Sequence, residues 1–101
     1  MIVDERTYTL ATGKLGELLS LYRQGGYEAQ RRHLGEPLGI FSVEVGELDG
    51  WVHMWRYQSV EDRAQRRARL AQDPQWQAFT RASAGLIVHR RNRLLEGVEL
   101  G

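Results

Sequence analysis

The sequence predicts an α+β domain, because strand-like and helix-like stretches follow one another along its 101 residues. Short runs rich in Val, Ile, Thr and aromatic residues alternate between two sets of side chains, as β-strands do. Longer stretches place apolar residues three or four positions apart, as helices do. Turns containing glycine or proline separate these stretches. The order along the chain is strand, helix, strand, strand, helices, strand.

The first strand is expected over residues 2–10, and a helix is expected from Lys14 to His33. Gly25-Gly26 interrupts the helical pattern. Each glycine costs about 1 kcal/mol in a helix interior relative to alanine, so we expect a kink, a break or close packing there. One face of the strand consists of Ile2, Asp4, Arg6, Tyr8 and Leu10. Two of these side chains are charged, which is unusual inside a central strand.

The second and third strands are expected over residues 38–46 and 51–57, joined by a two-residue turn at Asp49-Gly50. That turn would pair Leu48 with Trp51. It would place Ile40, Ser42 and Glu44 on the face of Trp51, His53, Trp55 and Tyr57. A three-residue loop would exchange the faces, so the face that carries the aromatic residues stays open.

The remaining elements are a helix over 60–72 with Ser59 as its N-cap, a helix over 74–84, and a last strand over 86–95. The whole order is that of a ferredoxin-like βαββαβ domain, in which helices cover one face of a four-stranded antiparallel sheet. Apolar residues occupy both faces of the second and third strands. We therefore expect a homodimer whose two sheets pack face to face, about 10 Å apart.

The composition excludes several classes of function. The chain has no cysteine, which rules out disulfides, thiolate metal sites and cysteine nucleophiles. No signal-peptide pattern is present at the start of the sequence and no apolar run is long enough to cross a membrane, so we expect a cytoplasmic protein without a membrane partner. A sequence pI of 8.2 is too low to suggest a nucleic-acid partner, and the arginine-rich stretch at 63–69 is expected to be a solvated helix face.

No phosphate- or dinucleotide-binding motif is present, and we expect no cofactor. The three histidines, His33, His53 and His89, have no close metal-ligand spacing, so no metal is expected. The candidate for chemistry is His53, because imidazole titrates near neutral pH and could act as a general acid or base, or contact a ligand. The simpler interpretation is a structural histidine bonded to Glu44 or Tyr57.

Arg6 projects beside Tyr8 and could hold a carboxylate or phosphate through two parallel hydrogen bonds. It could equally pair with an acid on its own or a neighbouring strand. Trp76 and Phe79, three residues apart, could seal the sheet or stack on a ligand. The candidate ligand-binding residues are therefore Arg6, Tyr8, His53, Trp55, Tyr57 and Trp76.

Four stretches resemble motifs of the NIPSNAP family: DERTYTLATGKL at 4–15, RRHLGEPLGIF at 31–41, GELDGWVHMWRY at 46–57 and ARLAQDPQWQAF at 68–79. They run in the family's order through nearly the whole chain. The resemblance implies a dimeric α+β barrel, in which two ferredoxin-like sheets close around an interior. It supplies no catalytic residue. Larger eukaryotic relatives have a mitochondrial leader and a duplicated domain, and we expect their organelle roles not to apply to this chain.

Two functional hypotheses follow. The first is a small NIPSNAP-like domain of unknown biochemical function that binds a small ligand or a protein partner. The second, implied by the resemblance, is a cofactor-independent monooxygenase-like enzyme acting on an aromatic or polyketide-like compound. There His53 would shuttle a proton, Trp55 and Tyr57 would hold a planar substrate, and Arg6 would fix its oxyanion. Whether the chain is an enzyme stays open. The enzyme hypothesis predicts a mostly apolar pocket of about 300–1,000 Å³ with His53 or Arg6 pointing into it, whereas a dry, filled interior would favour a binding or structural role.

Overall fold

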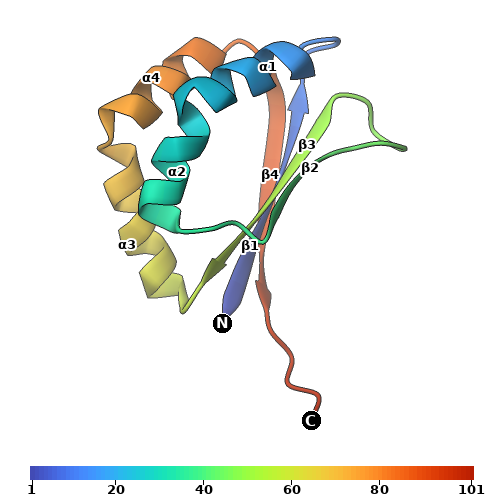
Figure 1. Ribbon diagram of the computed structural model, residues 1–101. Coiled ribbons are helices and arrows are strands. Elements are labelled where there is room, and N and C mark those ends of the chain that lie inside the picture. Colours follow the sequence, from blue (N-terminus) through green and yellow to red (C-terminus); the bar gives the residue numbers. More distant parts are fainter.

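The computed structural model describes residues 1–101 and shows a four-stranded antiparallel sheet with all helices on one side (Figure 1). The strands have the order β2-β3-β1-β4 in the sheet. They are β1 (Ile2–Leu10), β2 (Gly39–Ser42), β3 (Gly50–Tyr57) and β4 (Ile87–Glu96). The helices are α1 (Leu15–Leu21), α2 (Tyr27–Leu34), α3 (Val60–Ala71) and α4 (Pro74–Ser83). The predicted ferredoxin-like βαββαβ architecture is confirmed.

The aromatic face of β3 lies beneath the helices. In the pairing of β1 with β3, Arg6 is opposite His53 and Tyr8 is opposite Trp51. Directly opposite residues in a sheet project to the same side. The charged and aromatic residues of β1 therefore share the helix-covered layer with those of β3, which answers the question that the sequence left open.

The predicted two-residue hairpin turn is wrong. Trp51 pairs with Ser42 rather than Leu48, and β2 ends at Ser42, so residues 43–49 form a longer loop. The observed pairing differs from the predicted one by an even number of residues, so Ile40 and Ser42 still share a face with Trp51 and His53, as predicted. Asp49 has a positive φ of 59°, but it serves a tertiary contact: its carboxylate accepts a hydrogen bond from the Gly13 amide at 3.2 Å, and its carbonyl accepts from the Leu10 amide at 2.9 Å.

The paired glycines both break the helix and allow close packing. A π-helical turn, η1 (Tyr22–Gly26), joins α1 to α2, and Gly25 has non-helical backbone angles there. A Cβ on Gly26 would lie 2.8 Å from the ring of Phe79 in α4. Any larger residue would push α4 away from the turn, which explains why a glycine stands at this position.

The start of each later helix is fixed by a side chain. Ser59 caps α3 by accepting a hydrogen bond from the Asp62 amide at 3.0 Å, as predicted. Asp73 caps α4 at the Gln75 amide and also binds Nε2 of His33 at 2.8 Å and Arg32 at 2.6 Å. The hydrogen bond from His33 and its companions lower the pKa of Asp73 to about 2. This carboxylate therefore ties the end of α2 to the start of α4.

The core between sheet and helices forms two clusters, of which one contains Trp51 and the other Trp55 and Tyr57 from the aromatic stripe of β3. The first cluster consists of Tyr8, Leu10, Leu18, Tyr22, Trp51 and Phe79. The second cluster consists of Ala29, Leu34, Trp55, Tyr57 and Leu70.

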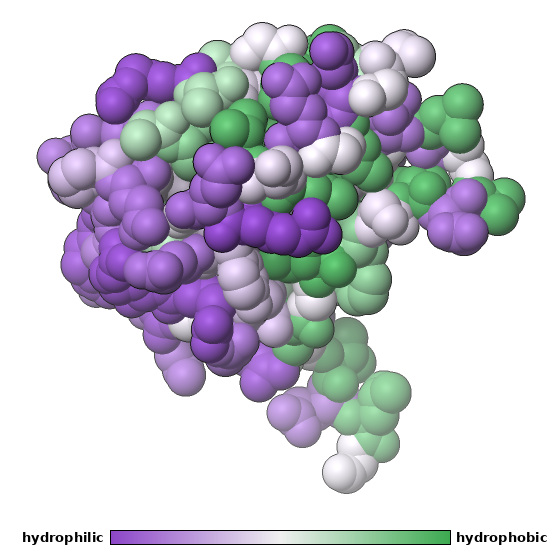
Figure 2. All heavy atoms as spheres, turned by 45° about the horizontal axis from the view of Figure 1, so that its top comes forward, coloured by the Kyte–Doolittle hydropathy of each residue, from purple (hydrophilic) through white to green (hydrophobic).

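The opposite face of the sheet has an apolar and a polar half. Phe41 of β2 is 51% exposed there, beside the half-buried Val52 and Met54 of β3. On the β1–β4 side, Arg93 pairs with Glu5 at 2.7 Å. Figure 2 shows hydrophilic atoms over the helical side and hydrophobic atoms gathered towards the sheet side. None of the helices combines the length and the hydropathy that crossing a membrane requires, and the expected cytoplasmic location stays a prediction.

Candidate ligand-binding cavity

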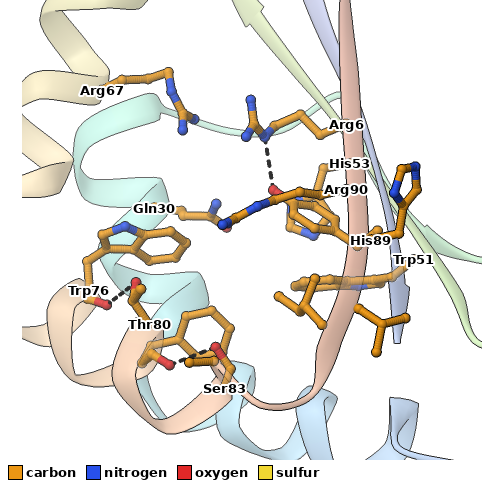
Figure 3. A pocket seen from close by; sticks show the side chains of 15 residues that line it. Arg6, Gln30, Trp51, His53, Arg67, Trp76, Thr80, Ser83, His89 and Arg90 are labelled. Atoms are coloured by element: carbon orange, nitrogen blue, oxygen red, sulfur yellow. Dashed lines mark hydrogen bonds between the residues drawn. The ribbon is translucent and has the colours of Figure 1, made fainter. Parts of the chain in front are cut away.

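A cavity of about 490 Å³ lies between the sheet and the helices (Figure 3). Its volume falls within the range of about 300–1,000 Å³ that small-molecule sites occupy. Both His53 and Arg6 belong to its lining, which is the observation that the enzyme hypothesis predicted. The sheet contributes Arg6, Tyr8, Trp51, His53, Ile87, Val88, His89 and Arg90, and the helical layer contributes Gln30, Arg67, Trp76, Phe79, Thr80, Ser83 and Ala84.

Arg6 is held in place by a buried carboxylate. Its Nε donates to the Tyr8 hydroxyl at 2.9 Å, and one terminal nitrogen donates to Asp4 at 3.2 Å. Arg63 and Asn92 also donate to Asp4, at 2.9 and 3.1 Å. Burial alone would raise the pKa of Asp4, but the hydrogen bonds from Arg63 and Asn92 and the charge of Arg6 keep it below its ordinary value. Asp4 is therefore ionised, which accounts for the charges inside β1.

His53 is a neutral, buried histidine. Its side chain is only 1% exposed, and Nδ1 accepts a hydrogen bond from Nε1 of Trp55 at 3.2 Å. Trp55 thus takes the place that the sequence assigned to Glu44 or Tyr57. Burial, and then the charge of Arg6, lower the pKa of His53 to about 3. Because Nδ1 accepts, the single proton sits on Nε2, and this atom has no partner in the chain.

The structure brings together four of the six predicted ligand-binding residues and separates the other two. Arg6, Tyr8, His53 and Trp76 line the cavity. Trp55 and Tyr57 do not, because they pack in the second cluster against Ala29, Leu34 and Leu70. The aromatic stripe of β3 is therefore divided between the cavity and the closed core.

Two arginines that line the cavity were missed in the sequence. Arg67 reaches in from α3 and Arg90 from β4 (Figure 3). The prediction that the arginine-rich stretch is a solvated face is wrong for Arg63, Arg66 and Arg67, which are half-buried. The small residues of the same helix are exposed instead, and they are Val60, Ala64, Ala68 and Ala71.

The helical spacing of buried Leu70 offered a signal that would have found this inner face of α3. Arg63, Arg67 and Leu70 lie at positions i, i+4 and i+7, which share one side of a helix. Arg90 pairs with Tyr8 in the sheet, so it could be placed on the cavity side once the strand register was known.

The lining of the cavity is positively charged on one side and apolar on the other. It contains Arg6, Arg67 and Arg90 but no aspartate or glutamate. The apolar side includes Trp51, Trp76 and Phe79. The chain has no group of three or more His, Cys, Asp or Glu side chains placed to hold a metal ion. The arrangement is suited to binding an organic molecule.

The architecture places the chain in the class of ferredoxin-like α+β domains that also includes antibiotic biosynthesis monooxygenases. A putative antibiotic biosynthesis monooxygenase from Nitrosomonas europaea superposes with a TM-score of 0.71 over 98% of this chain and 100% of that chain. The sequence identity is only 14%, so this likeness shows the fold alone.

Within that class, the chain belongs to the NIPSNAP family, whose model matches residues 3–100. A NIPSNAP family protein from Agrobacterium tumefaciens is 42% identical, with a TM-score of 0.93 over 97% of this chain and 93% of that one. Another from the same bacterium, 37% identical with a TM-score of 0.93 over 100% of this chain and 91% of that one, has unknown function.

A NipSnap homologue from Dictyostelium discoideum is 39% identical over 71 residues, which cover 70% of this chain and 31% of that protein. The matched parts of the curated relatives amount to between 18% and 31% of their lengths. The family resemblance predicted from the four motifs is confirmed. The structures of this family are described without a biochemical function, so the function has to be argued from the cavity.

Proposed function

We propose that this NIPSNAP protein binds a small organic molecule in the cavity between its sheet and its helices. The observation that carries the proposal is the pair of unpartnered donors in the cavity lining, Nε2 of His53 and Nε1 of Trp51. Buried polar groups are nearly always hydrogen-bonded, and an unmet donor costs about 1–3 kcal/mol. Both donor atoms are fully covered by their neighbours, so a bound molecule with acceptor atoms would satisfy them after a small shift of the side chains that line the cavity.

The state of His53 favours binding over proton-transfer catalysis. A general base works best when its pKa lies near the working pH, whereas the pKa of His53 is lowered to about 3. Trp55 and Tyr57, which would hold a planar substrate in the enzyme hypothesis, lie outside the cavity. The monooxygenase-like alternative therefore has the fold and the cavity in its support, but not the pKa of His53 or the positions of Trp55 and Tyr57.

The proposal is tested with the neutral fluorescent dye 1-N-phenylnaphthylamine, whose emission rises in apolar surroundings. We expect one saturable site per chain. Ala84→Trp should abolish it, because Ala84 lines the cavity. Ala82→Trp changes an exposed residue of the same helix outside the lining and should leave the binding intact. Absence of saturable binding, or equal loss in both variants, would contradict the proposal.

We also propose that the chain forms a homodimer through the helix-free face of its sheet. The support is the apolar half of that face, with Phe41 51% exposed, together with the projecting Val45 and Leu48 of the β2–β3 loop, which are 91% and 81% exposed. A second sheet would shield these side chains from water.

Sedimentation equilibrium at about 10 µM should then give twice the chain mass of 11.6 kDa. Phe41→Asp should shift the protein towards monomer. Val60→Asp, at a residue of α3 that is 59% exposed, should not. A monomeric wild-type protein at this concentration would overturn the dimer proposal.

A further inference from the structure

We infer that the cavity selects organic acids, with a carboxylate or phosphate group held between Arg6 and Arg67 and an apolar body packed against Trp51, Trp76 and Phe79. This inference rests on the proposed ligand-binding function and specifies the class of ligand.

Arg67 is a half-buried cation that forms no ion pair within the chain, whereas the neighbouring Arg63 and Arg66 each pair with a carboxylate. It lies near the hydroxyl of Tyr57, which carries no charge to balance it. Its guanidinium extends from α3 towards that of Arg6 (Figure 3). Burial, and then the like charge of Arg6, lower the pKa of Arg67. Partly buried cations that face one another are unfavourable until an anion lies between them.

The chain does not supply that anion. The carboxylate nearest in the network, Asp4, is fully buried behind Arg6 and already accepts hydrogen bonds from Arg6, Arg63 and Asn92. Asp4 is absent from the cavity lining, as is every other aspartate and glutamate. The free cationic groups of the cavity therefore face the space that a ligand would occupy.

The donors around this space suit an acidic group. Arg6 uses Nε and one terminal nitrogen within the chain, which leaves its second terminal nitrogen for a ligand. Arg67 has no acidic partner, and Arg90 adds a third guanidinium from β4 without an ion pair of its own. Gln30, 2% exposed, accepts from the Tyr22 hydroxyl through its oxygen and keeps its amide nitrogen free. Guanidinium groups bind carboxylates and phosphates through pairs of parallel hydrogen bonds.

The rest of the lining suits an apolar body. Trp76 and Phe79 lie with their ring centroids 5.3 Å apart at an interplanar angle of 34°. Trp76 faces Trp51 across the cavity (Figure 3), and Tyr8 also belongs to the lining. Aromatic surfaces favour stacked or tilted contact with another ring, and the cavity of about 490 Å³ has room for one or two fused rings beside the acidic group.

The test is a comparison of three naphthalene probes that differ in one substituent: 2-naphthoate, 2-naphthyl phosphate and the neutral 2-naphthamide. Each is titrated by calorimetry and in competition with 1-N-phenylnaphthylamine. A charge-assisted hydrogen bond predicts that at least one acid binds about 10-fold to 100-fold more tightly than the amide. The acid that binds better distinguishes a carboxylate ligand from a phosphate ligand.

Arg67→Gln should reduce the acid-over-amide affinity ratio about tenfold. The unfolding midpoint should hardly change, because Arg67, unlike Arg63 and Arg66, forms no ion pair in the chain. Arg69→Gln removes the same charge from an exposed position of α3 outside this cavity and should leave the ratio unchanged.

The two proposals fail in different ways. If the dye binds but the acids and the amide compete within twofold of one another, or if Arg67→Gln and Arg69→Gln act alike, the ligand class is refuted while cavity binding stands. If neither the dye nor any probe binds, the proposed function itself is refuted.

Discussion

The two ends of β3 carry the same aromatic pattern but lie in different surroundings. Trp51, His53, Trp55 and Tyr57 are 2%, 1%, 0% and 1% exposed, so burial does not distinguish them. The two ends differ in the residues of the helical layer that lie against them. Ala29, Leu34 and Leu70 pack on Trp55 and Tyr57, whereas Thr80, Ser83 and Ala84 of the C-terminal half of α4 line the cavity beside Trp51 and His53.

The difference teaches that a buried aromatic stripe is not by itself a ligand site. Tyr57, at the closed end, also has a buried hydroxyl without a partner, and burial raises its pKa. A groove at that end is lined by Tyr57, Arg56 and Arg66 but also by Glu36. At the other end, unpartnered donors, open volume and several arginines coincide without an acidic side chain in the lining. The combination of these three features identifies the candidate site, and the following predictions examine how far the two ends differ.

The largest expected effect is the loss of packing at the closed end. Trp55→Ala should lower the free energy of unfolding by about 3–5 kcal/mol, because it leaves a void in a closed cluster. Trp76→Ala removes a half-buried ring at the open end and should lower it by about 1–2 kcal/mol. Guanidinium unfolding of both variants measures the contrast, and equal losses would show that the two ends are packed equally well.

The second effect is a loss of folding stability at low pH that is caused by His53. Its pKa is about 3 in the folded protein and about 6.5 when unfolded, so the unfolded chain takes up the proton first as pH falls. Stability should therefore decline from about pH 6.5 downwards, by up to about 1.4 kcal/mol per pH unit. Asp4 and Asp73, with lowered pKa values, lose their contributions only at lower pH.

His53→Asn isolates this contribution, because the asparagine oxygen can still accept the hydrogen bond from Trp55 but does not titrate. Urea unfolding between pH 4.5 and pH 7 should show a flatter pH dependence in the variant than in the wild type. Identical slopes would mean that His53 is not held neutral by burial.

The smallest effect compares the same enlargement at the two ends. Ala29→Leu adds volume to the fully buried second cluster and should lower stability by about 1–3 kcal/mol. Ala84→Leu adds it at the exposed rim of the cavity, where we expect a change within about 0.5 kcal/mol and weaker dye binding. Thermal unfolding with dye titration distinguishes the two, and a large loss in Ala84→Leu would mean that the cavity is already filled.

Local patterns sufficed for much of the fold. The alternation in IVDERTYTL and GWVHMWRY placed Arg6, Tyr8 and His53 on strands, and Ser59 and Asp73-Pro74 marked the starts of α3 and α4. These features depend on neighbours within four residues, which the sequence displays directly. The β2–β3 register was missed because Asp49 is anchored to Gly13 and Leu10, at the far end of β1.

The sequence by itself determined the order of elements, the family and the residues that share each face of the sheet, because backbone periodicity fixes which side chains point the same way. The tertiary structure alone decided which part of the aromatic stripe lines the cavity and which arginines of α3 and β4 accompany it. The physical reason is that open volume and unpaired charge depend on the sizes and charges of side chains brought together from distant parts of the chain.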